Sequence, residues 1–177
     1  KELPSSLIVL GGGAIGVELA QVFVRFGVEV TVVEAMDRLV PAEEPEAGRL
    51  LAQVFEREGI AVRTAARVGA VRRDGARLAV ELEDGTSFAG AQLLVATGRR
   101  ADLAAVGLGA VGVDGAQRWV AVDDHLRVVG TEGVWAVGDC NGRGAFTHTA
   151  WNDHEIVVGH LFDGDTRRTA DRIACYA

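Results

Sequence analysis

The chain has 177 residues, of which 49% are hydrophobic, with 23 glycines and only 3 prolines. This is a globular composition, and the length suffices for one well-cored domain with part of a second. Binding to a nucleic-acid backbone rests on clustered cations, and the net charge here is −7, so we expect no nucleic-acid partner.

No apolar run approaches the roughly 20 residues that span a bilayer, and no secretion signal opens the sequence, so we expect no membrane partner. Cys140 and Cys175 form neither a disulfide framework nor a CxxC pair. A reducing, cytoplasmic location is the default expectation. The sequence starts without methionine, and residues 172–177 resemble a strand cut short, so we expect an excerpt of a longer polypeptide.

The first elements predict a βαβ unit. Residues 7–10 are fully apolar, as in a buried parallel strand, and a helix is expected from near Ala14 until Gly27. Residues 28–34 form the next expected strand. Apolar residues spaced by three and four define the expected buried face of the helix: Ile15, Leu19, Val22, Phe23 and Phe26.

A second helix is expected over residues 45–58, with Leu50, Leu51, Val54 and Phe55 as its buried face, followed by a strand at 60–63. Short runs at 68–73, 77–83 and 86–89 are joined by Asp-Gly pairs, which are typical of hairpins. Residues 92–96 then return to the parallel sheet. The predicted fold class is α/β: a Rossmann-like parallel sheet with helices and a three-stranded antiparallel meander.

After about Gly112 the pattern changes. Strands are expected at 120–122 and 134–137, and a helix at 146–162. The stretch is too short to predict a domain of its own.

The motif GGGAIG occupies residues 11–16, between the first expected strand and helix. At this spacing Gly11 permits a tight turn, Gly13 lets the backbone approach a pyrophosphate, and Gly16 lets the helix pack on the strand. Free N–H groups at the helix start would face the phosphates. A plain glycine-rich turn is the alternative, but the flanking strand and helix favour a dinucleotide site.

Glu34 closes the second expected strand, where a carboxylate can accept hydrogen bonds from the adenosine ribose. The alternative is a solvated acid at a strand end. A carboxylate there would repel the 2′-phosphate of NADP, and Ala35 follows instead of an arginine, so NAD(H) is preferred over NADP(H). Arg38 is the residue that could still reach a phosphate.

The sequence contains, in order, GGGAIGVE at 11–18, VTVVEA at 30–35, ATGRR at 96–100 and GVWAVGDC at 133–140. This ordered set resembles the pyridine nucleotide-disulfide oxidoreductase family, which includes lipoamide dehydrogenase, mercuric reductase and glutathione reductase. The resemblance covers essentially the whole chain. It implies an NAD(P)-binding domain at 1–111, the C-terminal part of an FAD-binding domain at 112–164, and the start of a dimerisation domain at 165–177.

The resemblance also implies cofactor contacts. Glu34 matches the NAD-type acid, Val68 a position near the adenine, and Gly98 the ATG glycine against the dinucleotide. By spacing alone Glu18 is a favourable charge near a helix start, whereas the family places an acid there beside the nicotinamide, paired with a flavin-side lysine absent from this chain. The residues that match the NAD loop are Gly11, Gly12, Gly13, Ala14, Ile15, Gly16, Val17 and Glu18.

Asp139 matches the acid that binds the ribityl chain of FAD, since a carboxylate accepts hydrogen bonds from hydroxyls; a turn-forming acid is the alternative. A helix start that points at the flavin is matched by Ala145, Phe146, Thr147 and His148. Three histidines, His148, His154 and His160, are six residues apart and do not share a helix face, so we expect no metal site.

The CxxxxC dithiol, the first FAD glycine motif and the His-Glu pair of the family have no match, so no catalytic residue is assigned, and Cys140 is interpreted as a packing residue. The resemblance implies a full-length FAD-dependent homodimer that passes a hydride from NADH to flavin and on to a disulfide or other acceptor. The alternative is a dinucleotide-binding module without turnover. A simple Rossmann dehydrogenase is disfavoured by GVWAVGDC.

A missing FAD half-domain would leave apolar surface uncovered. We therefore expect self-association or disorder after Gly112. The residues expected to lose their cover are Val134, Trp135, Val137, Ile156, Val157 and Leu161.

Overall fold

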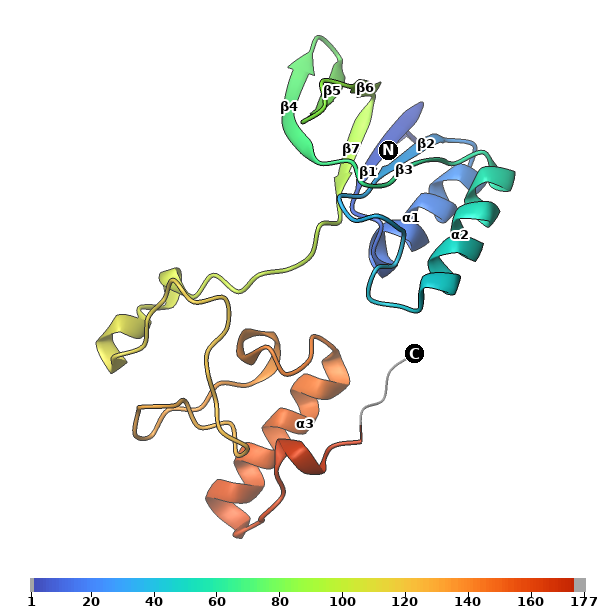
Figure 1. Cartoon of the computed structure of the whole chain (residues 1–177). Coiled ribbons are helices and arrows are strands. Elements are labelled where there is room, and N and C mark those ends of the chain that lie inside the picture. The colour runs from blue at the N-terminus through green and yellow to red at the C-terminus, as the bar shows by residue number, and fades with distance from the viewer. Residues whose placement is uncertain (1, 174–177) are drawn as a thin grey trace. The chain divides into compact units, whose positions relative to one another are not determined.

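The computed structural model describes residues 2–173, which form two compact units, residues up to Gly98 and residues from Arg99 (Figure 1). Each unit is described by itself. Of the strand expected over 172–177, residues 174–177, including Cys175, lie outside the described residues. The three domain assignments made from the sequence stay predictions.

The first unit contains a four-stranded parallel sheet in the order β3-β2-β1-β7. Its strands are β1 (Ser6–Leu10), β2 (Glu29–Val33), β3 (Ala61–Arg63) and β7 (Gln92–Val95). In register, Val9 of β1 lies beside Val32 of β2 and Leu94 of β7. The expected strands and the parallel sheet are confirmed, and their carboxyl ends share one edge, where ligands of such sheets bind.

Two helices, α1 (Ala14–Arg25) and α2 (Pro45–Glu58), lie on the same side of this sheet (Figure 1). Both were predicted to within the last turn. The core between helices and sheet is formed by Leu7, Val9, Ala20, Val28, Val30, Val32, Leu39, Phe55 and Ile60. Gly59 ends α2 with φ 81°, a left-handed conformation that glycine adopts without strain.

An antiparallel meander contacts β1 through the alternate side chains of that strand. It consists of β4 (Val68–Asp74), β5 (Arg77–Leu82) and β6 (Ser87–Gly90), as predicted. Because successive strand residues point to opposite faces, Ile8 and Leu10 of β1 pack with Val80 and Leu82 of β5, while Leu7 and Val9 pack on the helical side. Strand β1 is therefore buried on both faces.

Of the predicted buried face of α1, Phe23 packs against the core, but three of the five residues are exposed. Ile15 is 58% and Phe26 66% exposed, and Val22 is also exposed, whereas Gly16 and Ala20 are buried. The small residues let the helix axis approach β1 closely, and this contact outweighs the larger apolar side chains on the other face. Of the expected α2 face, Phe55 is fully buried but Leu50 is 55% exposed, because the buried Gly48 brings the helix start against the backbone of Leu39.

Within residues 99–173 no strand forms, so the strands expected at 120–122 and 134–137 are corrected to isolated bridges. Val122 bridges Val128 and Arg127 bridges Trp135. Leu126, with φ 63°, lies in the tight turn between Val122 and Val128. Gly130 and Gly133, also with positive φ, lie in the turn between Arg127 and Trp135. These turns leave too few residues in register for a ladder. Two short 3₁₀ turns, η1 (Ala104–Val106) and η2 (Leu108–Val111), precede this region.

The helix expected at 146–162 is confirmed as α3 (Thr147–Val158), which continues as a π-helical turn, η4 (Gly159–Asp163). Two 3₁₀ turns complete the unit, η3 (Gly138–Asn141) before α3 and η5 (Thr169–Asp171) after it. Across the described residues, no helix is both long and apolar enough to cross a membrane.

The second unit has its own small core, contrary to the expectation that its apolar residues lack cover. Ile156 is only 2% exposed, and Val134, Trp135 and Val157 pack against the same cluster. Val137 and Leu161 are exposed, as expected. Leu103, Val120, Leu126 and Val128 supply the cover that the sequence reasoning assigned to a missing half-domain. The expected self-association or disorder stays a prediction.

Candidate functional site

The loop between β1 and α1 depends on two glycines for its shape. Gly11 has φ 105°, and a Cβ atom there would lie 2.4 Å from the carbonyl oxygen of Ala96. A Cβ atom on Gly16 would lie 1.9 Å from the carbonyl oxygen of Gly11. Both contacts are shorter than any real Cβ tolerates, so the protein itself requires glycine at these two positions.

Gly13 differs from both of these glycines. It precedes α1 with φ −74°, and no atom lies within 4 Å of the position that a Cβ would take. The packing of the protein itself therefore does not require glycine at this position, and the absence of a side chain leaves space beside the helix start. No side chain caps α1, and the first N–H groups of a helix have no partner inside it. This open, uncapped helix start is suited to an anion.

Glu34 lies at the carboxyl end of β2 and is only 8% exposed. Its Oε2 accepts a hydrogen bond from the Gly12 N–H at 2.6 Å, and its Oε1 accepts one from the Met36 N–H at 2.7 Å. These two bonds fix the carboxylate beside the glycine loop. Each carboxylate oxygen can accept more than one hydrogen bond, so Glu34 can also accept from a ligand hydroxyl.

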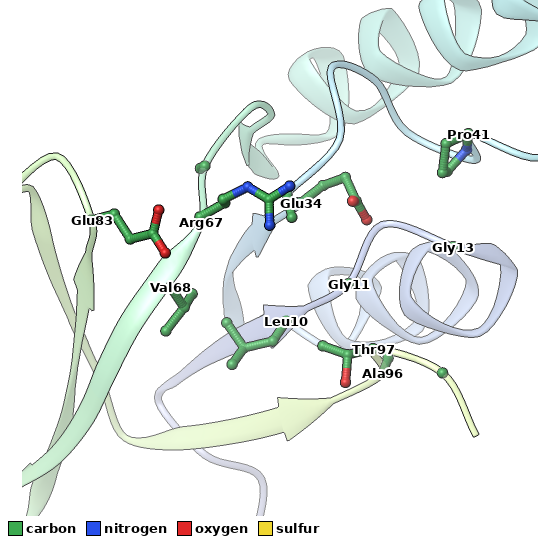
Figure 2. A pocket seen from close by; sticks show the side chains of 13 residues that line it. Leu10, Gly11, Gly13, Glu34, Pro41, Arg67, Val68, Glu83, Ala96 and Thr97 are labelled. Carbon is green, nitrogen blue, oxygen red and sulfur yellow. The ribbon is translucent and has the colours of Figure 1, made fainter. Parts of the chain in front are cut away.

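A cavity of about 520 Å³ opens at this edge of the sheet (Figure 2). Its lining, which belongs entirely to the first unit, is Leu10, Gly11, Gly13, Glu34, Ala35, Pro41, Ala66, Arg67, Val68, Glu83, Ala96, Thr97 and Gly98. The structure thus brings together five of the residues singled out from the sequence: Gly11, Gly13, Glu34, Val68 and Gly98.

The other residues of the glycine motif do not line the cavity. Gly12 and Gly16 are buried, and Val17 packs against the core under α1. Ala14, Ile15 and Glu18 are exposed on α1.

The arginine that lines the cavity of Glu34 is not the one that the sequence suggested. Arg38, the residue suspected of reaching a phosphate, donates to Asp37 and to the Pro41 carbonyl, each at 3.1 Å, and lines a different cavity beside α2. Arg67 was not considered, yet it lines the cavity of Glu34. Its position could have indicated this role, because Arg67 directly precedes Val68, the first residue of β4, which was expected to lie near the adenine.

In the second unit, Asp139 lies on the turn η3 with its side chain 40% exposed and its carboxylate 3.6 Å from the Arg99 guanidinium. The turn is fixed by hydrogen bonds to Asp153 of α3, which is 0% exposed. One oxygen of Asp153 accepts from the Gly138 N–H and from the Asn141 side chain, both at 2.8 Å. Asp153 therefore fixes the backbone that presents Asp139.

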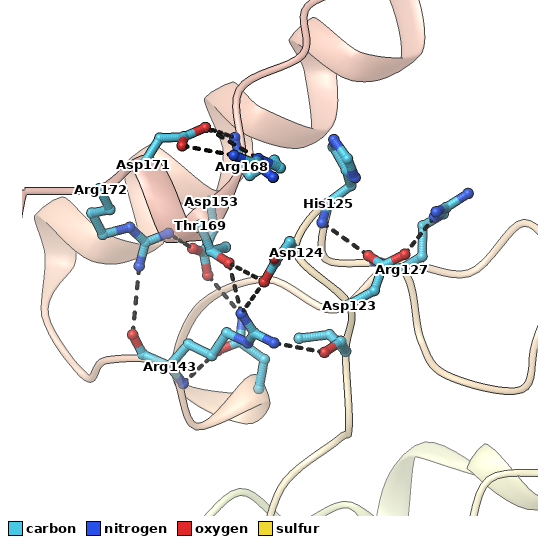
Figure 3. A network of polar contacts seen from close by, with 12 residues as sticks. Asp123, Asp124, His125, Arg127, Arg143, Asp153, Arg168, Thr169, Asp171 and Arg172 are labelled. Carbon is cyan, nitrogen blue, oxygen red and sulfur yellow. Dashed lines mark hydrogen bonds and ion pairs between the residues drawn. The ribbon is translucent and has the colours of Figure 1, made fainter.

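Arginines tie the last described segment to this turn (Figure 3). Arg172 pairs with Asp153 and donates to the Asn152 side chain. Arg143 donates to Asp124 at 3.0 Å and to the Thr169 hydroxyl. Sequence patterns did not reveal this network, because its hydrogen-bonded partners are separated by up to 45 residues.

The start of α3 carries the other residues matched to a flavin site. Ala145, Phe146, Thr147 and His148 are all exposed, and the rings of Phe146 and His148 stack with centroids 5.3 Å apart. No side chain caps this helix start. It therefore presents N–H groups to its surroundings, as the start of α1 does.

Cys140 has a half-buried thiol that donates to the Val137 carbonyl oxygen at 3.3 Å. Burial raises the pKa of this thiol, and the nearby carboxylates of Asp153 and Asp139 raise it further. A raised pKa disfavours the thiolate, which is the reactive form. These surroundings favour a packing role over redox chemistry. Among residues 2–173, no cluster of three or more potential metal ligands occurs.

The family model described as pyridine nucleotide-disulphide oxidoreductase matches residues 1–153 of the sequence. The chain belongs to this family. A mercuric reductase of Streptomyces lividans is 39% identical over 98% of this chain and 37% of its own length. A dihydrolipoyl dehydrogenase of Chlorobaculum tepidum is 39% identical over 89% of this chain and 34% of its own length.

A solved structure gives the same assignment. The Cu(II) complex of the HOCl-induced flavoprotein disulfide reductase RclA from Escherichia coli superposes with a TM-score of 0.87 and 32% identity. The match covers 97% of this chain and 40% of RclA. The chain thus spans between a third and two fifths of the length of these relatives.

Proposed function

We propose that the first unit binds NAD(H), with the diphosphate at the start of α1 and the adenosine ribose on Glu34. The observation that carries this proposal is the unfilled space beside Gly13, which adjoins an uncapped helix start and a carboxylate already fixed by two N–H groups. A negatively charged, hydroxyl-bearing ligand would satisfy both features.

NADH is proposed to bind in preference to NADPH. Glu34 would repel a 2′-phosphate, and among the described residues the cavity has two other charged lining groups, the Arg67 guanidinium and the Glu83 carboxylate. Arg38 is occupied by Asp37 and the Pro41 carbonyl. The charge of the lining therefore opposes an additional phosphate near the ribose.

For the full-length protein we propose an FAD-dependent oxidoreductase that passes a hydride from NADH to flavin and on to a disulfide or other acceptor. Bound FAD would supply the hydride-accepting ring. On this chain, Asp139 would accept hydrogen bonds from the ribityl hydroxyls, and the uncapped start of α3 would face the flavin. Residues 1–111, 112–164 and 165–177 are proposed as NAD(P) domain, FAD-domain part and dimerisation start. We also propose that the full-length protein is a homodimer located in the cytoplasm.

The second candidate is a dinucleotide-binding module without turnover. It is favoured by one sequence fact: the 177 residues contain neither a CxxxxC dithiol nor a first FAD glycine motif. Assaying the chain for NADH oxidation with added FAD separates the candidates. Turnover by this chain would contradict the module.

Calorimetric titration of the 177-residue protein with NADH and with NADPH tests the binding proposal. We expect saturable one-to-one binding of NADH and weaker binding of NADPH. No heat with NADH would contradict the site, and tighter binding of NADPH would contradict the proposed role of Glu34.

A further inference from the structure

Arg67 lies in the short loop that joins β3 to β4 and is exposed. Its backbone is anchored, because its carbonyl oxygen accepts a hydrogen bond from the Glu83 N–H at 2.9 Å, and the neighbouring Ala66 N–H donates to the Glu34 carbonyl at 2.9 Å. Figure 2 shows the Arg67 side chain extending along the cavity toward Glu34. A fixed backbone therefore carries a long side chain over the adenosine end of the proposed site.

Among residues 2–173, the Arg67 guanidinium makes no hydrogen bond or ion pair, although Glu34 and Glu83 line the same cavity. Two other exposed arginines of the first unit are engaged: Arg25 pairs with Glu58 and Arg72 with Glu81. The planar face and the donors of Arg67 are thus free for a ligand.

Two kinds of ligand group suit a free guanidinium: a phosphate or a flat aromatic ring. The surroundings decide between them. Two carboxylates line the cavity around Arg67, and Asp84 lines the adjoining hollow with Glu83. A phosphate next to Arg67 would be repelled by these carboxylates, whereas a neutral base would not be repelled. Leu10 and Val68 supply apolar lining for such a base.

We propose that Arg67 stacks on the adenine ring of NAD(H), with its guanidinium parallel to the base. The inference rests on the proposed function, because it requires the adenosine half to lie beside Glu34. Arginine is suited to this role since its guanidinium is planar, delocalised and weakly hydrated, and lysine has none of these properties. Arg67 is thereby a binding residue that selects for an aromatic base.

The experiment compares R67A, R67K and R67W in the full 177-residue chain, titrated calorimetrically with NADH and with ADP-ribose. Stacking predicts that R67A and R67K bind both ligands roughly three- to tenfold more weakly. R67W, which replaces one flat group by another, should stay within about twofold of the parent protein. R73A removes an exposed arginine of β4 outside the cavity and serves as the control with unchanged affinity.

Three outcomes would overturn the inference. Parent-like affinity of R67A would show that Arg67 does not contact the ligand, and parent-like affinity of R67K with loss in R67W would show a role of charge alone. Equal losses in all three variants would show that a flat side chain brings no benefit. Each outcome leaves NADH binding by the parent protein intact, whereas a parent protein that binds no NADH refutes the proposed function itself.

Discussion

The two units of this protein achieve order in different ways. The first unit has a parallel sheet whose strand β1 is buried on both faces by two apolar clusters, and its candidate site is formed largely by backbone: glycines, strand ends and a helix start. The second unit has only isolated bridges among its described residues, one small core, and a network of arginine and aspartate side chains. Substitutions in the first unit should therefore change stability or binding mainly through steric overlap. Those in the second unit should change stability mainly through the loss of charged hydrogen bonds and ion pairs.

The largest effect is expected for G16A in the first unit. The added methyl group would lie 1.9 Å from the Gly11 carbonyl oxygen, so α1 must move off the sheet. Overpacking of this severity destabilises by about 3 kcal/mol or more. Thermal unfolding should measure the loss of stability, and hydrogen exchange should locate it in residues 2–98. Unchanged protection there would contradict the close approach of helix and strand.

A loss of about 2–4 kcal/mol is expected for D153A in the second unit, because it leaves Arg172 and the Gly138 N–H without their buried partner. Hydrogen exchange should show weakened protection in residues 99–173 with the first unit unchanged. D163A removes an exposed aspartate that makes no hydrogen bond or ion pair with the described part of the chain, and it is the matched control. Equal stability of the two variants would show that the network contributes little.

The third prediction separates structure from ligand in one loop. G13A adds the same methyl group as G16A, but into space that no described atom occupies within 4 Å. Stability should stay within about 0.5 kcal/mol of the parent, while NADH binding weakens roughly tenfold because the methyl group lies where the diphosphate approaches. G109A, another glycine with open space around it, is the control. Unchanged NADH affinity of G13A would argue against a diphosphate at this position.

The smallest effect concerns pH. Burial of Asp123 raises its pKa, but hydrogen bonds from the Arg127 N–H and guanidinium and from the His125 N–H outweigh burial, so the pKa is lowered in the folded protein. A lowered pKa stabilises the fold above the unfolded value, near 3.9, and this contribution is lost as pH falls through the folded value. Unfolding of the second unit measured from pH 6 to pH 2 should show a smaller acid-induced loss in D123N. Identical pH profiles would contradict this role.

Local sequence patterns were sufficient for most of the first unit. The apolar run before Gly11, the Asp-Gly pairs at 74–75 and 84–85, and Gly59 after the second helix each act over a few residues, so their elements were predicted to within about one turn. The glycine motif likewise indicated Gly11 and Gly13, and the end of the following strand indicated Glu34; the structure places all three around one cavity.

Other features were decided only by contacts between distant residues. The buried face of α1 follows from how closely the helix can approach β1, so Gly16 and Ala20 are buried while Ile15 and Phe26 are not. The orientation of Arg38 away from the cavity, the entry of Arg67 into its lining, and the clamp of Asp153 on the Gly138 turn depend on loops that meet in space. Sequence determined the elements and the glycine motif because those are set by neighbours along the chain. Tertiary structure decided which faces and which charges meet, because packing and hydrogen bonding act between segments that only folding brings together.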